Sequence, residues 1–292
     1  MRNLTEHNIT EAVLNTLNSD NARLNQILTG LVKHLHAFVR EVELTEEEWL
    51  AAIQFLTRTG QMCDDERQEF ILLSDTLGAS ILVDAINNRK DEAATPSTVL
   101  GPFHREGAAE VEHQHNIAGE GTAGEPVIVS GRVTAPNGEP IAGALLDIWQ
   151  ASAEGFYDIQ DESQPEMNLR CKLRTDERGR FAFRTIKPSS YPIPDDGPVG
   201  DMLRALNRHP YRPAHVHFII TAEGYEPVVT HIFVDGDPYL DSDAVFGVKS
   251  ALIAEFVRHD SAEEAEQYGV AAPFFTVRYN FVLQPRDRRD TS

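Results

Sequence analysis

The stretch that decides the fold has the sequence HPYRPAHVHFIIT and covers residues 209–221. A β-strand points successive side chains to opposite faces, so His215 and His217 would share one face and the apolar residues next to them the other. The prolines just before this strand restrict its backbone. Two imidazoles on one face form half of a metal site, since histidine is a common metal ligand. The alternative is that each histidine is only a hydrogen-bonded polar residue in a sheet.

The same spacing of two histidines occurs twice more without these features. His34 and His36 lie in a strongly helical stretch, where positions i and i+2 do not share a face. His113 and His115 lie among polar residues, with no apolar strand to hold them. Spacing alone is therefore weak evidence, and only the pair at 215 and 217 combines an apolar strand with a rigid approach.

Length, composition and charge bound the class of protein. A chain of 292 residues suits one large domain or two smaller ones, and 41% hydrophobic residues are enough for a packed core. The net charge of −20 argues against nucleic acid or an anionic membrane as a partner. The sequence contains no apolar run long enough to span a bilayer and no recognisable signal peptide. Two distant cysteines, Cys63 and Cys171, fit a reducing cytoplasm better than a disulfide framework.

The N-terminal third predicts helices. Apolar residues within 24–42 recur at intervals of three and four, as in an amphipathic helix. Thr45 and Glu48 form a capping box that opens a second helix. A third helix is expected at residues 65–81. The apolar faces of these helices are expected to form core or a subunit interface.

The pattern then changes to short strands. Residues 87–102 are polar and contain two prolines, which predicts a linker or a wrapping loop. The segment 176–179 (DERG) is a hairpin signal. Strand-like runs occupy residues 127–133, 144–149, 170–174, 180–186, 215–221, 228–234 and 274–283. Such runs predict a mainly β chain with an α-helical N-terminal region, in which the strands form an antiparallel β-sandwich. The expected domains are residues 1–100, with the linker, and 101–292.

Two loops that follow strands each carry a tyrosine, Tyr157 and Tyr191. A tyrosine in such a loop more often packs or forms a hydrogen bond than binds a metal. Phenolate is nevertheless a hard anionic donor that favours Fe(III) over Fe(II) or Zn(II), and a trivalent ion would ionise tyrosine despite its reference pKa of about 10. Fe(III), two phenolates and one hydroxide sum to zero charge. A catecholate dianion that replaces the hydroxide and one phenolate gives the same sum.

Taken together, these motifs resemble the intradiol ring-cleavage dioxygenases. The resemblance rests on Tyr157, on YPIP at residues 191–194 with DGPVG at 196–200, and on RPAHVHF at 212–218. It covers nearly the whole chain, and it implies a helical dimerisation region followed by a β-sandwich that holds one Fe(III) per subunit. It also implies a homodimer formed through the N-terminal helices, with a lipid bound between them as in family members.

The resemblance implies roles for individual residues. The iron ligands would be Tyr157, Tyr191, His215 and His217. Tyr157 and His215 would stay bound, whereas Tyr191, axial like His217, would leave when the substrate chelates the iron and would take up a substrate proton. Arg212 would lie over the bound ring and stabilise carbanion character at the carbon that O2 attacks. Its alternative is a surface salt bridge.

The substrate implied by the resemblance is an ortho-diphenol, cleaved by O2 between its hydroxylated carbons. Asp75 is polar where a catechol-only enzyme would be apolar, and the tract at 237–248 is similar to the hydroxyquinol branch of the family. The expected substrate is therefore hydroxyquinol (benzene-1,2,4-triol), giving 3-hydroxy-cis,cis-muconate, the enol tautomer of maleylacetate. Asp75 could equally be a carboxylate on a helix surface. The expected pocket residues are Leu72, Asp75, Val99, Leu100, Gly101, Pro102, Phe103, Phe246 and Gly247.

Two alternatives remain open at this stage. Catechol or a chlorocatechol is the alternative substrate, and a non-catalytic β-sandwich module with a structural zinc is the alternative class. Two residues also depart from the family pattern. His231 stands where catechol enzymes carry glutamine and is not counted as a ligand, and His104 stands where a tyrosine is common.

Overall fold

The chain divides by its contacts into two compact units. The computed structural model describes residues 2–64 and 67–286, and the boundary between the units falls after Gln61. The expected division into residues 1–100 and 101–292 differs from this boundary and stays a prediction about domain organisation. In the described part of the chain, no helix is long and apolar enough to cross a membrane.

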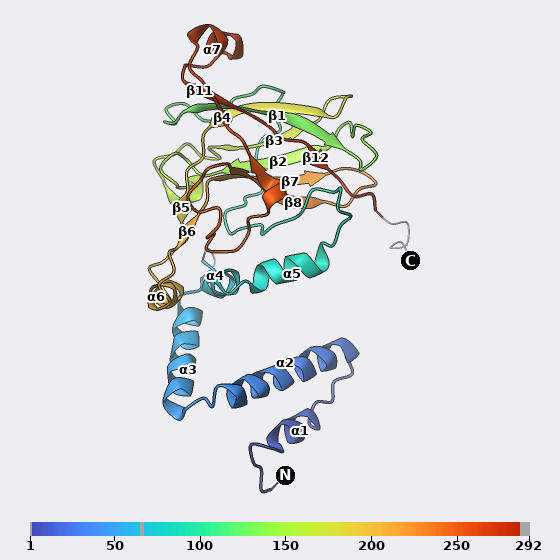
Figure 1. Cartoon of the computed structure of the whole chain (residues 1–292), viewed down its shortest axis with the longest axis vertical. Helices are drawn as coiled ribbons and strands as arrows, with labels where there is room; N and C mark the ends of the chain where they lie inside the picture. The colour runs from blue at the N-terminus through green and yellow to red at the C-terminus, as the bar shows by residue number, and fades with distance from the viewer. Residues whose placement is uncertain (1, 65–66, 287–292) are drawn as a thin grey trace. The chain divides into compact units, whose positions relative to one another are not determined.

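Three helices make up the first unit (Figure 1): α1 (Ile9–Leu14), α2 (Ala22–Glu41) and α3 (Glu46–Gln61). The amphipathic helix expected at 24–42 is α2, and the Asn21 side chain caps it by accepting a hydrogen bond from Leu24 N at 3.0 Å. The predicted capping box opens α3. Glu48 Oε2 accepts from Thr45 N at 3.0 Å, and Thr45 Oγ1 accepts from Glu48 N at 3.2 Å.

The single helix expected at residues 65–81 is wrong. Two helices, α4 (Glu69–Thr76) and α5 (Ala79–Asn87), occupy this region, and the expected start at residue 65 lies outside the described residues. Gly78 separates the two helices with a φ of 74°, a left-handed conformation that glycine adopts without a Cβ clash. Its N–H donates to Asp75 O at 3.0 Å and so ends α4.

Two five-stranded sheets and a two-stranded ribbon form the second unit's sandwich (Figure 1). The first sheet holds β1 (Pro126–Thr134), β4 (Arg180–Ile186), β10 (Val257–His259), β11 (Phe274–Arg278) and β12 (Phe281–Val282). The second holds β2 (Leu145–Gln150), β3 (Arg170–Arg174), β7 (His215–Thr221), β8 (Val228–Val234) and β9 (Ile253–Ala254). The ribbon pairs β5 (Tyr191–Pro192) with β6 (Tyr211–Arg212). Short helices lie between strands: η1 (Asp158–Gln160), α6 (Pro198–Ala205), η2 (Ser250–Leu252) and α7 (Ala262–Tyr268).

Strand order and direction agree with the predicted sandwich in most pairs. The second sheet runs in the order β3-β2-β7-β8-β9, and the first in the order β10-β11-β1-β12 with β4 beside β1. Most pairs are antiparallel, as predicted. Three are parallel: β1 with β11, β1 with β12, and β8 with β9. The sandwich is therefore built from mixed sheets.

The turn predicted at Asp176–Gly179 forms, but the hairpin prediction is wrong. Gly179 N donates to Asp176 O at 2.9 Å, and Gly179 has a φ of 69°. However, β3 pairs with β2, and β4 pairs with β1. Leu173 and Phe181, on either side of the turn, both enter the core between the sheets. The turn thus carries the chain from one sheet to the other, because each strand buries its apolar side chains against the opposite layer.

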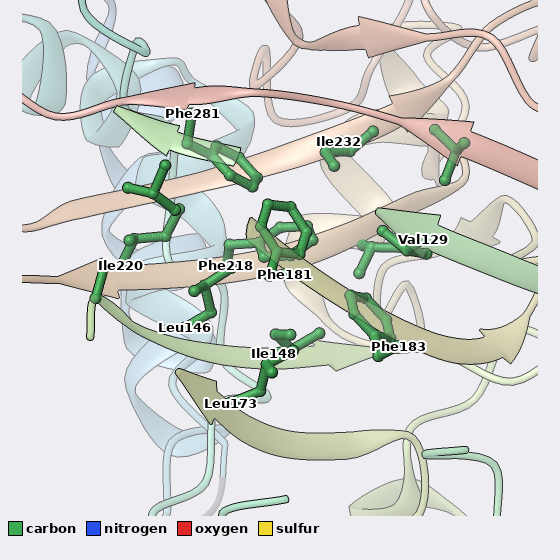
Figure 2. Packing of buried hydrophobic residues seen from close by; sticks show 14 of the residues in the cluster. Val129, Leu146, Ile148, Leu173, Phe181, Phe183, Phe218, Ile220, Ile232 and Phe281 are labelled. Carbon is green, nitrogen blue, oxygen red and sulfur yellow. The ribbon is translucent and has the colours of Figure 1, made fainter. Parts of the chain in front are cut away.

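A single apolar core fills the space between the two sheets (Figure 2). The ring of Phe281 in β12 contacts Phe181 of the first sheet and Phe218 of the second, with centroids 5.7 and 4.9 Å apart. Phe218 and its neighbours at 216 and 220 face this core. The alternation of β7 therefore turns His215 and His217 to the opposite face of the sheet, as predicted.

The segment between α5 and β1 wraps the sandwich instead of hanging free as a linker. Thr95 N donates to Val282 O at 2.9 Å, and Thr98 N donates to Val229 O at 2.9 Å. Further on, Val111 N donates to Lys172 O at 2.8 Å and continues the edge of β3. These backbone bonds bring residues 98–103 beside β7 and β8, where the histidines lie.

Candidate metal centre and substrate pocket

Four side chains from separate parts of the chain meet in one buried cluster. Tyr157 Oη lies 2.9 Å from His217 Nε2 and 3.2 Å from Tyr191 Oη. His215 Nε2 lies 3.0 Å from His217 Nε2. Each of the four is at most 3% exposed. The structure thus brings both tyrosines of the predicted set to the histidine pair.

The loop after β2 presents the Tyr157 phenol through a local network. Tyr157 N donates to Gln160 Oε1 at 3.1 Å and opens the short helix η1. The next residue, Asp158, accepts from Arg170 Nε and from Arg105 Nη1, both at 2.7 Å. Because charge-assisted bonds to two arginines hold this aspartate, the loop has little freedom to move the phenol.

Tyr191 lies in the two-stranded ribbon, directly opposite Arg212 in the β5–β6 register. Gly155 approaches its other side: a Cβ on that glycine would lie 2.9 Å from Tyr191 Cβ, and Gly155 has a φ of 87°. Both the close approach and the left-handed backbone require glycine there. The loop that carries Tyr157 is therefore packed directly onto Tyr191.

The backbone and a neighbouring ring orient the two histidines. His215 Nδ1 lies 2.7 Å from Pro213 O and donates to it, which leaves the Nε2 lone pair directed at the cluster. The His217 ring stacks on Trp149, with centroids 4.5 Å apart and planes 11° from parallel. On its other side, a Cβ on Gly101 would lie 3.3 Å from His217 Cε1. Both rings are thus fixed before any metal binds.

Burial determines the protonation of these groups. It lowers the pKa of His215 well below its ordinary value, and the charge of Arg212 acts in the same direction. Burial likewise lowers the pKa of His217, with His231 and His215 adding to the effect. Burial and the neighbouring Tyr191 raise the pKa of the Tyr157 phenol well above its ordinary value. Two neutral imidazoles and a phenol that ionises only beside a strong positive charge are a donor set that fits a metal cation.

His231 is a third histidine beside the cluster. It lies directly opposite His217 in the β7–β8 register and is fully buried. The ligand nitrogens of His215, His217 and His231 all lie within 4.8 Å of one another. Burial lowers the pKa of His231 well below its ordinary value, His215 and Arg212 act in the same direction, and a hydrogen bond with the backbone of Val99 opposes them. His231 was noted in the sequence only as a departure from the family pattern, and its position beside the cluster follows from the strand register.

Arg212 is buried, so the surface salt-bridge alternative is wrong. Its Nε lies 3.2 Å from Asp243 Oδ1 and its Nη2 lies 3.4 Å from Asp243 Oδ2. Its third nitrogen, Nη1, lies 3.3 Å from His215 Nε2. Burial alone would lower the pKa of the guanidinium, but Asp243 and Tyr191 outweigh it and raise the pKa, so Arg212 remains a cation. Sequence reasoning missed Asp243, which lies in the acidic tract at 237–248.

A pocket of about 660 Å³ opens between α4, α5 and the wrapping segment. Of the expected pocket residues, it is lined by Asp75, Val99, Leu100, Gly101 and Pro102. Asp75 is only 8% exposed, which excludes the helix-surface alternative. Burial raises the pKa of Asp75, whereas its hydrogen bond with Ser80 and the charge of Arg212 act in the opposite direction. A carboxyl group thus lies in the pocket and within electrostatic range of the Arg212 cation.

The other expected pocket residues do not line this 660 Å³ pocket. Phe103 stacks on Tyr157 with centroids 4.6 Å apart. Gly247 packs against Arg212, and Leu72 is buried in α4. Phe246 is half exposed and lines a separate pocket of about 480 Å³.

His104 does not reach the cluster directly. Its Nε2 lies 3.2 Å from Asp147 Oδ2, and its ring contacts the edge of Trp149. Because Trp149 stacks on His217, His104 supports the metal cluster through one intervening ring. The histidine that replaces the family's common tyrosine at position 104 therefore lies beside Trp149.

Comparison with known proteins identifies the class. Residues 99–285 match the family described as Dioxygenase, and residues 21–95 match Catechol dioxygenase N terminus. The chain belongs to the intradiol ring-cleavage dioxygenases, and the resemblance inferred from its tyrosine loops and histidine strand is confirmed.

Several relatives within this family are similar to the chain over nearly its whole length. The chain is 52% identical to a 6-chlorohydroxyquinol 1,2-dioxygenase of Cupriavidus pinatubonensis over 98% of this chain and 99% of that protein. It is 53% identical to a hydroxyquinol 1,2-dioxygenase of a Rhizobium species over 90% of each. The structure of a hydroxyquinol 1,2-dioxygenase from Pseudomonas putida is similar with a TM-score of 0.91 at 50% identity, covering 96% of this chain and 99% of that one. For a catechol 1,2-dioxygenase from an Acinetobacter species the TM-score is 0.84 at 29% identity, with 97% and 92% covered.

Proposed function

We propose that this protein opens the ring of hydroxyquinol between its vicinal hydroxyls with O2, giving 3-hydroxy-cis,cis-muconate and its tautomer maleylacetate. The observation that carries the proposal is the convergence of Tyr157, Tyr191, His215 and His217 beside the buried Arg212 cation. About half of the sequence is identical to one enzyme named for hydroxyquinol and to another named for 6-chlorohydroxyquinol. Catechol or a chlorocatechol remains the alternative substrate.

We propose one Fe(III) per subunit as the metal. Two phenols and two imidazoles supply two hard anionic oxygens once the phenols ionise, which suits Fe(III) better than Zn(II). Bound there, the iron would supply the charge that ionises the phenols and the Lewis acidity that activates an ortho-diphenol toward O2. His231 adds a third buried imidazole beside these groups, which supports a site for a cation there.

Individual residues of the chain would bind the metal, take up the substrate proton and stabilise charge on the substrate ring. Tyr157 Oη contacts two cluster atoms, whereas Tyr191 Oη contacts one, which supports Tyr191 as the ligand that leaves and takes up a substrate proton. Tyr157, His215 and His217 would then hold the metal in place. Arg212 would place a fixed positive charge beside the ring carbon that becomes electron-rich. The buried aromatic walls exclude water from this step.

Asp75 supports the choice of hydroxyquinol. Its buried carboxyl group lies in the pocket beside Val99 and Gly101, where a third hydroxyl group could donate to it. Catechol has no such hydroxyl and would leave the carboxyl with its Ser80 bond alone, and a lost hydrogen bond to such a buried group costs about 1–3 kcal/mol in binding.

Oxygen uptake by the purified protein tests the proposal, with hydroxyquinol and catechol measured side by side. We expect a wine-red protein with one iron per chain, since phenolate-to-Fe(III) charge transfer absorbs in the visible, and faster uptake with hydroxyquinol. Comparable or faster uptake with catechol would reverse the substrate choice. A colourless protein with stoichiometric zinc would instead support the non-catalytic module.

We also propose a homodimer formed through the first unit, with a lipid between the helices as the family resemblance implies. Its support is a stripe of exposed apolar side chains on α2, among them Leu24, Ile27, Leu31, Leu35 and Phe38. Contiguous exposed apolar side chains of this kind often mark a protein–protein interface. A reducing cytoplasm is the proposed compartment, because two cysteines far apart in the sequence suit it better than a disulfide framework does.

A further inference from the structure

We propose that Asp243 is a positioning residue for ring cleavage, because it sets the orientation of the Arg212 guanidinium toward the metal cluster. The inference rests on the proposed function and adds a residue to it. The Arg212 cation would then act as part of a buried arginine–aspartate pair and not alone.

Each of the three nitrogens of the Arg212 guanidinium has a contact. Nε and Nη2 face the two oxygens of Asp243 at 3.2 and 3.4 Å, and Nη1 faces His215 Nε2 at 3.3 Å. The guanidinium is planar and its donors have a fixed fork geometry. Once two nitrogens are paired with one carboxylate, the direction of the third is determined. That third nitrogen is the one nearest to the ligand atoms.

The backbone in turn holds Asp243. Gly247 N donates to Oδ2 at 2.9 Å, and Val245 N donates to Oδ1 at 3.3 Å. Ala244 N donates to Tyr211 O at 3.1 Å, which ties this loop to β6, the strand that carries Arg212. The carboxylate therefore cannot rotate without breaking bonds to its own loop, and the pair moves as one body with the ribbon.

Gly247 packs closely against the guanidinium and its carboxylate partner. A Cβ at that position would lie 3.0 Å from Arg212 Nη2 and 3.2 Å from Asp243 Oδ2. The Thr98 hydroxyl donates to Gly247 O at 2.8 Å and holds the glycine there. No side chain fits between loop and guanidinium, so the loop is in direct van der Waals contact with the arginine.

Charge provides a second reason for the pair. A lone buried guanidinium next to the cluster would repel the metal cation, since Coulomb forces are strong where water is excluded. Asp243 cancels this charge at longer range, while the Nη1 hydrogens remain directed at the reacting atoms. The arrangement combines a local donor for developing negative charge with little net repulsion of the metal.

A double-mutant cycle tests the proposal, with turnover followed as single turnovers so that slow variants remain measurable. We expect Asp243→Asn to retain iron and colour and to lower kcat about 10- to 100-fold, somewhat less than the loss of a whole stabilising donor, while KM changes little. In an Arg212→Ala background the same substitution should have no further effect. In a crystal structure of the metal-free Asp243→Asn variant, Nη1 should be displaced from His215 Nε2.

Glu69→Gln is the matched control. Glu69 is also a fully buried carboxylate that pairs with an arginine, Arg67, at 2.9 Å and accepts from a backbone N–H, that of Val199, at 3.1 Å. The Glu69→Gln variant should have a lower melting temperature, as Asp243→Asn should, but an unchanged kcat. A loss of kcat in both variants in proportion to stability would show that Asp243 acts only on the fold.

Gly247→Ala perturbs the same guanidinium without changing any charge, and it carries the test if Asp243→Asn does not fold. We expect a comparable loss of kcat that again disappears in the Arg212→Ala background. Unchanged kcat in both single variants, or a loss of the same factor with and without Arg212, would overturn the inference. If the unmodified protein cleaves no ortho-diphenol at all, it is the proposed function that fails.

Discussion

At the scale of single residues, the proposed metal centre depends most on the phenol oxygen of Tyr157. This atom contacts both Tyr191 Oη and His217 Nε2, and the ring beneath it stacks on Phe103. Tyr157→Phe removes one hard donor and leaves the packing in place. We expect the purified variant to contain less than about a tenth of the iron of the parent, in line with the loss of a metal ligand, and to lack its visible absorption band.

Tyr279→Phe is the control for that change, because its hydroxyl donates to Ala251 O at 2.6 Å and is remote from the cluster. It should retain iron and colour. Arg212→Ala should also stay coloured while its turnover falls severely, since the arginine is not a ligand. A colourless arginine variant would show that Arg212 supports the structure of the cluster instead.

Asp75 gives a residue-scale prediction for pH. Burial raises its pKa, so the folded state binds the proton more tightly than the unfolded chain, and the ionised carboxylate destabilises the fold. This penalty is present above the folded-state pKa and disappears as pH falls through it. We expect Asp75→Asn to melt at a higher temperature than the parent at pH 8, with the gap closing toward pH ~4, near the carboxyl's unperturbed pKa.

Asp161→Asn should behave in the opposite way. Hydrogen bonds from Ser163 lower the pKa of Asp161, so its ionised form stabilises the fold at neutral pH, and that contribution is lost as pH falls. Thermal melts of both variants at several pH values measure the two trends. A gap between Asp75→Asn and the parent that does not vary with pH would contradict the assigned role of burial.

How far single residues were predictable depends on how local their signal is. His215 and His217 could be identified because an alternating strand and its prolines lie in one short stretch. The two tyrosines have no such local signal, and only the resemblance to a family connected them with the histidines. Asp243 was missed because nothing in sequence separates it from Asp237 and its other acidic neighbours; only the tertiary approach of that loop to β6 does.

At the scale of elements, regular strands were predictable and interrupted helices were not. The bounds of β3, β4, β7 and β8 coincide with the strand-like runs read from the sequence, because each run is short, rich in β-branched or aromatic residues and bounded by turn residues. The helix break at Gly78 was missed, since the apolar spacing of three and four continues across it. The helix α6 was missed as well, although its Pro198 fits the first turn of a helix.

Gly78 allows this element boundary to be tested. Gly78→Ala would place a Cβ in a backbone with a φ of 74°, where the nearest side-chain atom is 3.6 Å away, so strain rather than collision determines the cost. We expect the free energy of unfolding to fall by about 1–2 kcal/mol. Gly30→Ala, inside α2 with no atom within 4 Å of its Cβ, should instead raise stability by about 0.5–1 kcal/mol. Chemical denaturation of both variants checks the signs; equal effects would refute the left-handed constraint.

At the scale of the whole molecule, the proposed site lies in one compact unit and the proposed dimer surface in the other. The proposed ligands, Arg212, Asp243 and the pocket around Asp75 all belong to the unit that begins after Gln61. The first unit contributes helices whose apolar side chains are half exposed, although the chain carries a net charge of −20 that keeps most proteins soluble and apart. An acidic protein with such a stripe needs something to cover it, and a second copy of the same stripe would do so.

Leu31 lies in the middle of this stripe and is 58% exposed. If α2 forms the proposed dimer, Leu31→Glu buries a carboxylate in an apolar interface and should convert a two-chain particle into a single chain, as measured by light scattering during gel filtration. Gln26→Glu adds the same charge to the same helix at a polar position and should leave the dimer intact. Because the proposed site residues all lie in the second unit, kcat with hydroxyquinol should change less than about twofold, as for surface substitutions away from a site. A Leu31→Glu variant that keeps the mass of two chains would place the dimer contact elsewhere, whereas a single-chain parent would mean that another partner covers α2.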